Sequence, residues 1–440
     1  MGPDPKLTRA PRARMVTFAF CVLILGAFAA ACSSTPLSEP STTPTTVHGS
    51  SSASTTQPLK STSSTSVPPV APTIKLTKLA FFDPTSGFGL FIRQRQTDCG
   101  ALVGFTTNGG AVFGEPVSVT TWPCSGTASV TALAFDDHGD GFAFGPDLFE
   151  SHNHGATWSH VPQPGQILSV EALGSSVWMV EADCPLSTSP QTPCPMRLVE
   201  SQNGGLTWTS TTIPASLTLN NGYGASAGQT WLLRISPSAA YLSSNLPFGA
   251  QGPPPTNAPL WFTSDRGRTW APRKIPCGFG AFTVALSAVP DGPLFAVCAG
   301  QPGAGNSLKS VLSSTDDGVT WATPYPCATT STGVSESCAT SPLAAGYLGG
   351  IDAVSASTVF LYGPRSSLLV TRDGGIAWSP VTPPIGDTSE GTSTVTFFGA
   401  SDGVVLGYDG LHNDVNTIWS TTNSGLTWRS VVPVLPTPVR

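Results

Sequence analysis

An eight-residue phrase, Ser/Thr-x-Asp/Asn-x-Gly-x-Thr-Trp, recurs in seven variants, and its acidic position is the first place where chemistry could reside. A repeated carboxylate could ligate a metal ion or act as a general acid. Three variants carry Asp265, Asp316 and Asp373 there, and the other four carry Asn108, Asn153, Asn203 and Asn423. Asn keeps the hydrogen-bond acceptor but loses the charge. The pattern therefore indicates a hydrogen-bonded turn, in which the Gly supplies a positive φ.

Other residue types that could perform chemistry lie outside this octapeptide or at its variable positions. Three histidines, His152, His154 and His160, suggest a metal site, but two occupy variable turn positions and the third lies in a predicted outer strand. We expect a solvated turn there, with no metal and no cofactor. Glycoside hydrolysis requires two carboxylates roughly 5–10 Å apart. The acidic candidates are Asp98, Glu181, Asp183 and Glu336, and their spacing in the sequence does not fix their mutual distances.

The N-terminal region predicts export. Basic residues from Lys6 to Arg14 precede the apolar run Met15–Ala31, which is the layout of a secretory signal peptide over residues 1–31. The run ends in Ala29-Ala30-Ala31-Cys32-Ser33, which resembles the lipobox of bacterial lipoproteins. That resemblance implies lipidation of Cys32 and anchoring to the outer face of the cell membrane. Simple secretion is the alternative.

A flexible linker is predicted over residues 32–72, because 28 of the 40 residues from Ser33 to Pro72 are Ser, Thr or Pro. The remaining chain, residues 73–440, forms the predicted folded domain. Charged residues make up 10% of the chain, against about 25% in typical proteins. A net charge of −6 without a basic stripe argues against a nucleic-acid partner. Many glycines and prolines indicate short strands and turns, hence an all-β domain.

The octapeptides resemble Asp-boxes, also called BNR repeats, which occur in sialidases, sortilin-type receptors, xyloglucanases and photosystem II assembly-factor-like propellers. In those families each box joins the third and fourth strands of a propeller blade. Seven copies at intervals of 45 to 62 residues therefore imply a single seven-bladed β-propeller of four-stranded antiparallel blades. We expect the strands of the first blade at residues 76–82, 87–93, 102–106 and 112–117.

Strand order in such a blade separates two faces. The octapeptides and the 1–2 turns lie on one, here called the octapeptide face, and the 2–3 and inter-blade connections lie on the other, the loop face. Insertions at residues 94–100, 183–195 and 236–259 are predicted to be 2–3 loops, and residues 323–345 an inter-blade loop. Binding residues concentrate in such loops. The candidates are Arg93, Arg95, Asp98, Asp183, Tyr223, Tyr241, Phe248, Tyr325 and Glu336.

Eight cysteines remain once Cys21 and Cys32 are set aside, an even number that suits disulfides in an exported protein. Pairing of nearest neighbours places every bridge on the loop face. The predicted disulfides are Cys99–Cys124, Cys184–Cys194, Cys277–Cys298 and Cys327–Cys338.

The functional hypothesis is a noncatalytic, membrane-tethered, monomeric propeller that binds a cell-envelope protein or a glycan through its loop face. The alternative is a carbohydrate-active enzyme, sialidase-like or xyloglucanase-like, with carboxylates on the same face. Sialidases carry Phe-Arg-Ile-Pro ahead of the first box, and the nearest string here, Arg234-Ile235-Ser236-Pro237, lies in the fourth blade. Whether the protein is an enzyme stays open, with the balance towards binding.

Overall fold

The computed structural model describes residues 72–136, 138–183, 194–211, 213, 218–219, 229–244, 258–277, 281–300, 304–325, 341–387, 390–409 and 415–435. All structural statements below refer to these ranges. The predicted signal peptide, Cys32 and the linker up to residue 71 lie outside them.

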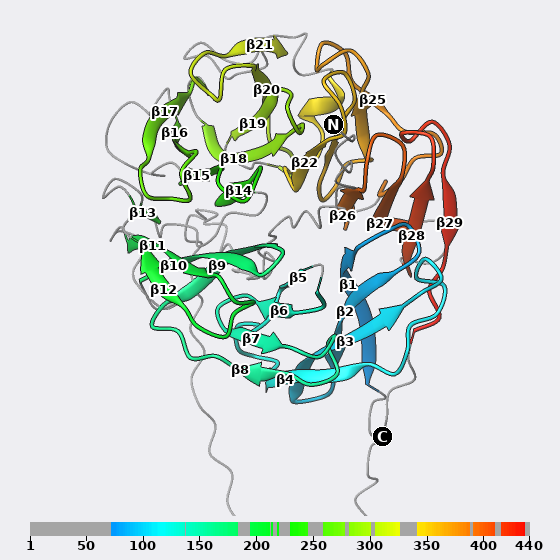
Figure 1. Ribbon diagram of the computed structural model, residues 1–440. Coiled ribbons are helices and arrows are strands. Elements are labelled where there is room, and N and C mark those ends of the chain that lie inside the picture. The colour runs from blue at the N-terminus through cyan, green and yellow to red at the C-terminus, as the bar shows by residue number, and fades with distance from the viewer. Residues whose placement is uncertain are drawn as a thin grey trace, which may run out of the picture. The chain divides into compact units, whose positions relative to one another are not determined.

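Seven antiparallel sheets, each built on four consecutive strands, surround a common centre (Figure 1). Blade 1 contains β1 (Thr73–Phe81), β2 (Gly87–Gln94), β3 (Asp98–Thr106) and β4 (Val117–Pro123). Blade 2 contains β5 (Ala132–Phe135), β6 (Gly141–Phe144), β7 (Leu148–Ser151) and β8 (Ser159–His160). Blade 3 contains β9 (Gln166–Leu173), β10 (Ser176–Ala182), β11 (Cys194–Ser201) and β12 (Thr209–Thr211), and β13 (Thr218–Leu219) pairs with β11.

The remaining four blades repeat this order. Blade 4 contains β14 (Leu232–Arg234), β15 (Ala240–Ser243), β16 (Ala258–Thr263) and β17 (Ala271–Ile275). Blade 5 contains β18 (Ala281–Ala288), β19 (Leu294–Gly300), β20 (Lys309–Ser314) and β21 (Ala322–Tyr325). A short 3-10 helix, η2 (Pro342–Ala344), precedes blade 6, which contains β22 (Gly350–Ala353), β23 (Val359–Tyr362), β24 (Leu369–Thr371) and β25 (Ser379–Pro380). Blade 7 contains β26 (Thr392–Phe397), β27 (Gly403–Asp409), β28 (Val415–Thr421) and β29 (Arg429–Val431). The predicted all-β, seven-bladed propeller is confirmed.

Each repeated octapeptide forms the same turn between the third and fourth strands. The Ser/Thr hydroxyl donates to the Asp/Asn Oδ1 at 2.7–3.0 Å and accepts from the Gly N–H at 2.9–3.1 Å. The same Oδ1 accepts the N–H of the seventh residue at 2.8–3.0 Å. Hydrogen bonds from Thr269 hold the pKa of Asp265 down to about 2. Asp and Asn thus serve the turn equally as acceptors.

Two consecutive residues of every octapeptide adopt the left-handed conformation. The Gly at position five has φ between 74° and 102°, as the sequence predicts, and position four has φ between 57° and 74°. Position four is Gly in three turns but His154, Arg266, Asp317 and Ser424 in the others. A non-Gly residue in this region costs about 1–2 kcal/mol. The hydrogen bonds of the turn must therefore offset that strain in four of the seven blades.

The apolar core is divided into seven clusters, one between each pair of neighbouring blades. Each cluster receives the eighth residue of the octapeptide of its later blade. Trp158, Trp208, Trp270, Trp321, Trp378 and Trp428 fill this place at six junctions, and Phe113 fills it where blade 1 meets blade 7. The aromatic side chain of the octapeptide therefore joins two blades. In three blades its indole N–H also donates to the carbonyl oxygen of the Gly of its own turn at 3.1 Å.

The ring closes without a shared blade, because blades 1 and 7 are each built from four consecutive strands. Lys78 Nζ donates to the Ser393 carbonyl oxygen at 2.9 Å, and Ser393 Oγ donates to the Thr77 carbonyl oxygen at 3.2 Å. The end of the described chain adds a parallel bridge between Val112 and Val434. Closure thus depends on side chains and one short backbone contact.

Several sequence-based boundaries were wrong. The last two residues of the predicted 183–195 loop belong to β11, and the first three of the predicted 323–345 loop belong to β21. The fourth strand of blade 1 starts at Val117 instead of residue 112, because residues 114–116 separate the octapeptide from the strand and the Val434 segment pairs at Val112. Residues 98–100 belong to β3, so the predicted 94–100 loop shortens to a tight turn. Within the predicted 236–259 loop, residues 236–239 form the 1–2 turn and Ala240–Ser243 is β15.

Replacement of Trp378 by Ala should destabilise the fold by about 3–5 kcal/mol, because it leaves a cavity in the core between blades 5 and 6. Ile376 lies two residues earlier in the same turn with 65% of its surface exposed, so Ile376→Ala should change stability by less than about 0.5 kcal/mol. Denaturant unfolding of both variants measures the difference. Equal losses in the free energy of unfolding would show that the octapeptide turn, and not the Trp378 side chain between the blades, supplies the stability.

Candidate functional site

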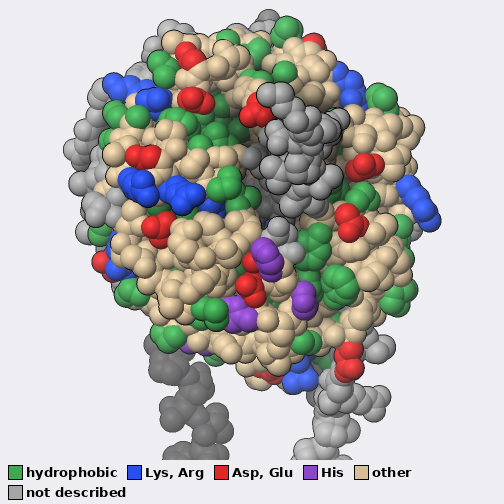
Figure 2. Space-filling model, in the orientation of Figure 1, with side chains coloured by type: hydrophobic (Ala, Val, Ile, Leu, Met, Phe, Trp, Pro, Cys, Tyr) green, Lys and Arg blue, Asp and Glu red, His purple; other side chains and the backbone are tan. Residues whose placement is uncertain are grey.

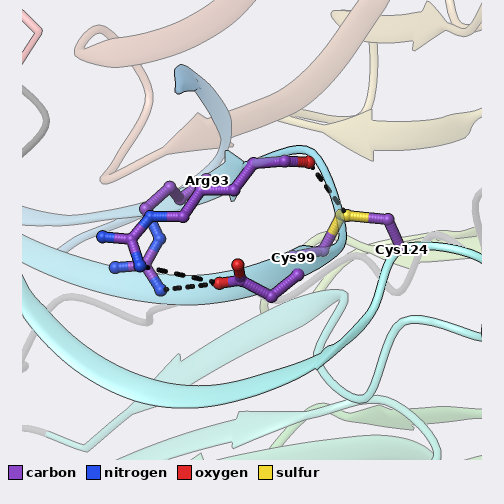
Figure 3. The surroundings of a disulfide bond; sticks show 5 residues. Arg93, Cys99 and Cys124 are labelled. Atoms are coloured by element: carbon purple, nitrogen blue, oxygen red, sulfur yellow. Dashed lines mark hydrogen bonds and ion pairs between the residues drawn. A yellow bond between two sulfur atoms is a disulfide. The ribbon is translucent and has the colours of Figure 1, made fainter. Parts of the chain in front are cut away.

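Three of the predicted binding residues meet at the loop face of blade 1. Arg93 lies near the end of β2, Asp98 begins β3, and Arg95 lies in the turn between them. Asp98 Oδ2 lies 3.6 Å from Arg93 Nη2 and 3.8 Å from Arg95 Nη1 (Figure 3). The turn is tight because the Arg95 N–H donates to the Asp98 carbonyl oxygen at 2.9 Å. These three residues are here called the blade 1 charge cluster.

A disulfide fixes the position of this cluster. Cys99 follows Asp98 in β3, and its bridge to Cys124 ties β3 to the residue that follows β4. The Cys124 N–H donates to the Thr97 carbonyl oxygen at 3.1 Å, and Cys124 Sγ lies 3.6 Å from the Arg95 carbonyl oxygen (Figure 3). The bridge therefore holds the turn that carries Arg95 against the outer strand of the blade.

The predicted Cys277–Cys298 bridge is also present and joins the segment before β18 to β19. Cys194 at the start of β11 is disulfide-bonded. Its predicted partner Cys184, and the predicted pair Cys327–Cys338, lie outside the described residues.

The blade 1 charge cluster can hold an anionic or hydrogen-bond-accepting group. Two guanidinium groups share one carboxylate, which leaves a net charge of about +1 at this corner. Arg93 Nε is buried and makes no hydrogen bond within the described part of the chain, and the Arg95 side chain is 39% exposed. The donors of Arg95 are therefore accessible to a ligand, while Asp98 orients both arginines.

A second pair of predicted acidic residues lies at the loop-face end of blade 3. Glu181 is buried in β10, where its Oε1 lies 3.1 Å from Arg197 Nη2 and accepts the Gly165 N–H. Burial raises the pKa of the Glu181 carboxyl, and Arg197 opposes this shift. Asp183 follows β10, is exposed, and adds a repulsion that also favours the protonated form of Glu181.

Tyr241 was wrongly placed on the loop face. It lies in β15 with 2% of its surface exposed, and its hydroxyl donates to Asp317 Oδ1 of the blade 5 octapeptide at 3.3 Å. The cause is the misplaced 236–259 loop, since Tyr241 belongs to a strand that it was thought to follow. Tyr325 is the last residue of β21. Tyr223, Phe248 and Glu336 lie outside the described residues.

Arg234, from the sialidase-like string, has a structural environment. Its guanidinium lies 4.5 Å from the centre of the Trp178 ring, and Nη1 donates to the Ser176 carbonyl oxygen at 2.7 Å. Burial lowers the pKa of Arg234 to about 10. The side chain therefore joins blade 4 to blade 3 and is not presented to a substrate.

A charged pocket that the sequence did not predict lies at the centre of the ring. Strands β1, β5, β9 and β26 line it. Lys78 and Glu171 are its charged lining residues, and burial lowers the pKa of Lys78 well below its ordinary value. The sequence carried a partial signal, because Lys78 is followed by Leu79 and Ala80, and Glu171 lies between Val170 and Ala172.

A second group, of which the sequence pointed only to His152, lies on the octapeptide face of blade 2. His152 Nδ1 lies 3.1 Å from Asp140 Oδ1, and His152 Nε2 lies 3.6 Å from Glu150 Oε2. Trp208 of blade 3 donates its indole N–H to Glu150 Oε1 at 2.8 Å. Figure 2 shows histidines and carboxylates together over this part of the visible face. Among the described residues, no group of three or more His, Cys, Asp or Glu side chains could hold a metal ion.

Comparison with known proteins gives structural likenesses of low sequence identity. No protein-family model and no curated protein matches the chain. The structure of YCF48 from Cyanidioschyzon merolae is 16% identical, with a TM-score of 0.46 over 81% of this chain and 97% of that one. YCF48 bound to D1 peptide is 14% identical, with a TM-score of 0.43 over 69% and 80%. A GH74 xyloglucanase from Xanthomonas campestris is 12% identical, with a TM-score of 0.39 over 69% and 54%.

The described residues contain no helix that is long and apolar enough to cross a membrane. The strands and their connecting turns account for nearly all regular structure, and η2 is a single short turn.

Glu150 should make folding stability depend on pH. Burial raises the pKa of its carboxyl from 4.5 to about 7 in the folded state. The folded protein therefore binds a proton that the unfolded chain has released, and this contribution to stability is lost as pH rises from 4.5 to about 7. Glu150→Gln should remove the loss and stabilise the protein at neutral pH by up to about 3 kcal/mol.

Thermal melting across this pH range measures the effect. The matched control is Asp387→Asn, which alters an exposed carboxyl on blade 6. If the melting temperatures of Glu150→Gln and of the parent protein changed in parallel with pH, the contacts of Glu150 with Trp208 and His152 would fully offset the effect of burial on its carboxyl.

Proposed function

We propose that this protein is a noncatalytic propeller that binds a cell-envelope protein or glycan outside the cytoplasmic membrane. The blade 1 charge cluster is the observation that carries the proposal. Its arginine donors are held at the loop face by a short turn and by the Cys99–Cys124 bridge. A site that is rigid before binding loses little conformational freedom on binding. An acidic peptide segment or a carboxylate-bearing sugar fits the net positive charge.

The geometry at the loop face favours binding over catalysis. Asp98 is the carboxylate of the blade 1 charge cluster, and it is engaged by two arginines. Glu181 is buried against Arg197 and the Gly165 N–H, which is the environment of a structural carboxylate. Hydrolysis of a glycosidic bond would need a second acid that faces a common substrate.

A glycoside hydrolase is the second candidate, and one observation favours it. Glu181 and Asp183 are two residues apart at the end of β10, and burial raises the pKa of Glu181 while Asp183 is exposed. A general acid in a glycosidase is typically a carboxyl whose pKa is raised by burial, near a second, solvated carboxyl. In this reading Glu181 would be the general acid and Asp183 the base or nucleophile.

The proposal also places the protein on a membrane through a lipid on Cys32, as the lipobox-like sequence suggests. Expression in a bacterium with labelled palmitate should give a labelled protein, and Cys32→Ala should abolish the label. Labelling that survives this substitution would rule out Cys32 as the anchor.

Arg93→Ala/Arg95→Ala should weaken partner capture by about 10-fold or more, because arginines in rigid sites often dominate binding energy. The full chain is used to capture partners from envelope extracts and to probe a glycan panel. Arg268→Ala/Arg372→Ala, on the octapeptide face, is the matched control and should bind as the parent does. Loss of capture in the control alone would place the site on the other face.

The same glycan panel separates the two functions. Turnover of any glycan that disappears in Glu181→Gln or Asp183→Asn would overturn the binding-only proposal. Binding without product, with both variants still active in binding, would exclude the hydrolase.

A further inference from the structure

The pocket at the centre of the ring, here called the central pocket, combines one buried cation with hydroxyl and apolar side chains. Lys78, Thr394 and Thr396 line it, and they are 5%, 8% and 4% exposed. The inner strands β1, β5, β9 and β26, which contribute the lining, surround the centre of the ring (Figure 1). The pocket has room for a group of only a few non-hydrogen atoms. It therefore suits a small ligand.

Hydrogen bonds place Lys78 and Thr394 together at the junction between blades 1 and 7. Lys78 Nζ donates to the Ser393 carbonyl oxygen at 2.9 Å, and the Leu79 N–H donates to Thr394 Oγ1 at 3.5 Å. Thr394 and Thr396 are two residues apart in β26, so they point to the same side of the sheet. An ammonium group and two hydroxyl groups thus line one part of the central pocket, and all three can donate hydrogen bonds.

The electrostatics of the central pocket favour an anion. Burial lowers the pKa of Lys78 well below its ordinary value, so the interactions of Lys78 within the protein do not offset the lost hydration of its charge. Glu171, the acidic lining residue, lies on β9 in blade 3. Burial lowers the pKa of Arg234, and the carboxylate of Glu171 raises it, so Glu171 already acts on a nearby cation. A ligand that carries a negative charge would stabilise the charged form of Lys78.

We propose that the central pocket binds a small carboxylate anion through Lys78 and Thr394. The two oxygens of a carboxylate can accept hydrogen bonds from the Lys78 ammonium and from the Thr394 hydroxyl at the same time. Leu79 and Leu133 contribute apolar lining, and a low local dielectric strengthens such charge-assisted bonds. The pocket is too small for a peptide segment. This site is therefore separate from the blade 1 charge cluster, and it does not depend on the proposed function.

Thermal melting of the full chain in sodium formate tests the proposal. A ligand of three non-hydrogen atoms gains at most about 1.5 kcal/mol per atom, so we expect a Kd on the order of 1 mM. Formate at about ten times this concentration should raise the melting temperature by about 2 °C. Sodium chloride at the same concentration controls for ionic strength and should give less than half of this shift. A chloride shift as large as the formate shift would overturn the carboxylate assignment.

Substitutions in the central pocket should change the formate affinity in opposite directions. Lys78→Met should abolish the formate shift, and Lys274→Met, which removes an exposed lysine on β17, is the matched control and should keep it. Thr394→Val removes one donor without changing the charge and should raise the Kd about 5-fold. Glu171→Gln removes a negative charge from the lining and should lower the Kd about 2-fold or more. Melting curves without formate show that each variant is folded.

The blade 1 charge cluster is the competing site for a small anion. Arg93→Ala/Arg95→Ala should therefore keep the full formate shift if the central pocket is the binding site. Loss of the shift in this variant, with the shift retained in Lys78→Met and Thr394→Val, would place the anion at the charge cluster and overturn the proposal. A parent protein that formate does not stabilise would overturn it as well, and so would weaker formate binding by Glu171→Gln.

Discussion

Each repeat contributes one aromatic side chain to the apolar core that it shares with the preceding blade. The circular arrangement of the blades depends on this contact. Sheets of four short strands cannot bury both faces alone, so each needs a neighbour. The octapeptide holds this aromatic side chain at the same position in every blade, because its turn is always closed by the same three hydrogen bonds. One local motif thereby sets the spacing between blades, and the strain at its left-handed positions is offset by those bonds.

The junction of blades 7 and 1 departs from this rule in several linked ways. Phe113 replaces the larger indole there, the following strand starts later, and the end of the described chain bridges to Val112. β4 is nevertheless the longest outer strand among the described blades. Features that look independent in sequence, such as a missing Trp and an uncharged strand, thus belong to one corner of the molecule.

The sequence predicted those features that depend on short-range patterns. The octapeptides located the turns, the strand order separated the two faces, and neighbouring cysteines predicted Cys99–Cys124 and Cys277–Cys298. It failed where the answer depends on residues from different blades or on a misread strand. Tyr241 looked like a loop residue because β15 was not recognised, and the contact between Glu150 and Trp208 joins positions 58 residues apart. No local pattern records such a contact, because blade packing creates it.

Since every blade is one continuous stretch of the described chain, no sheet within the described residues combines strands from its beginning and its end. A cut in any connection between blades, with the original ends joined, would leave all seven sheets with their own strands. Gain or loss of one whole repeat would likewise need no strand to be rethreaded. The number of blades is therefore set by how many wedge-shaped units fit around the centre, and topology places no restriction on it.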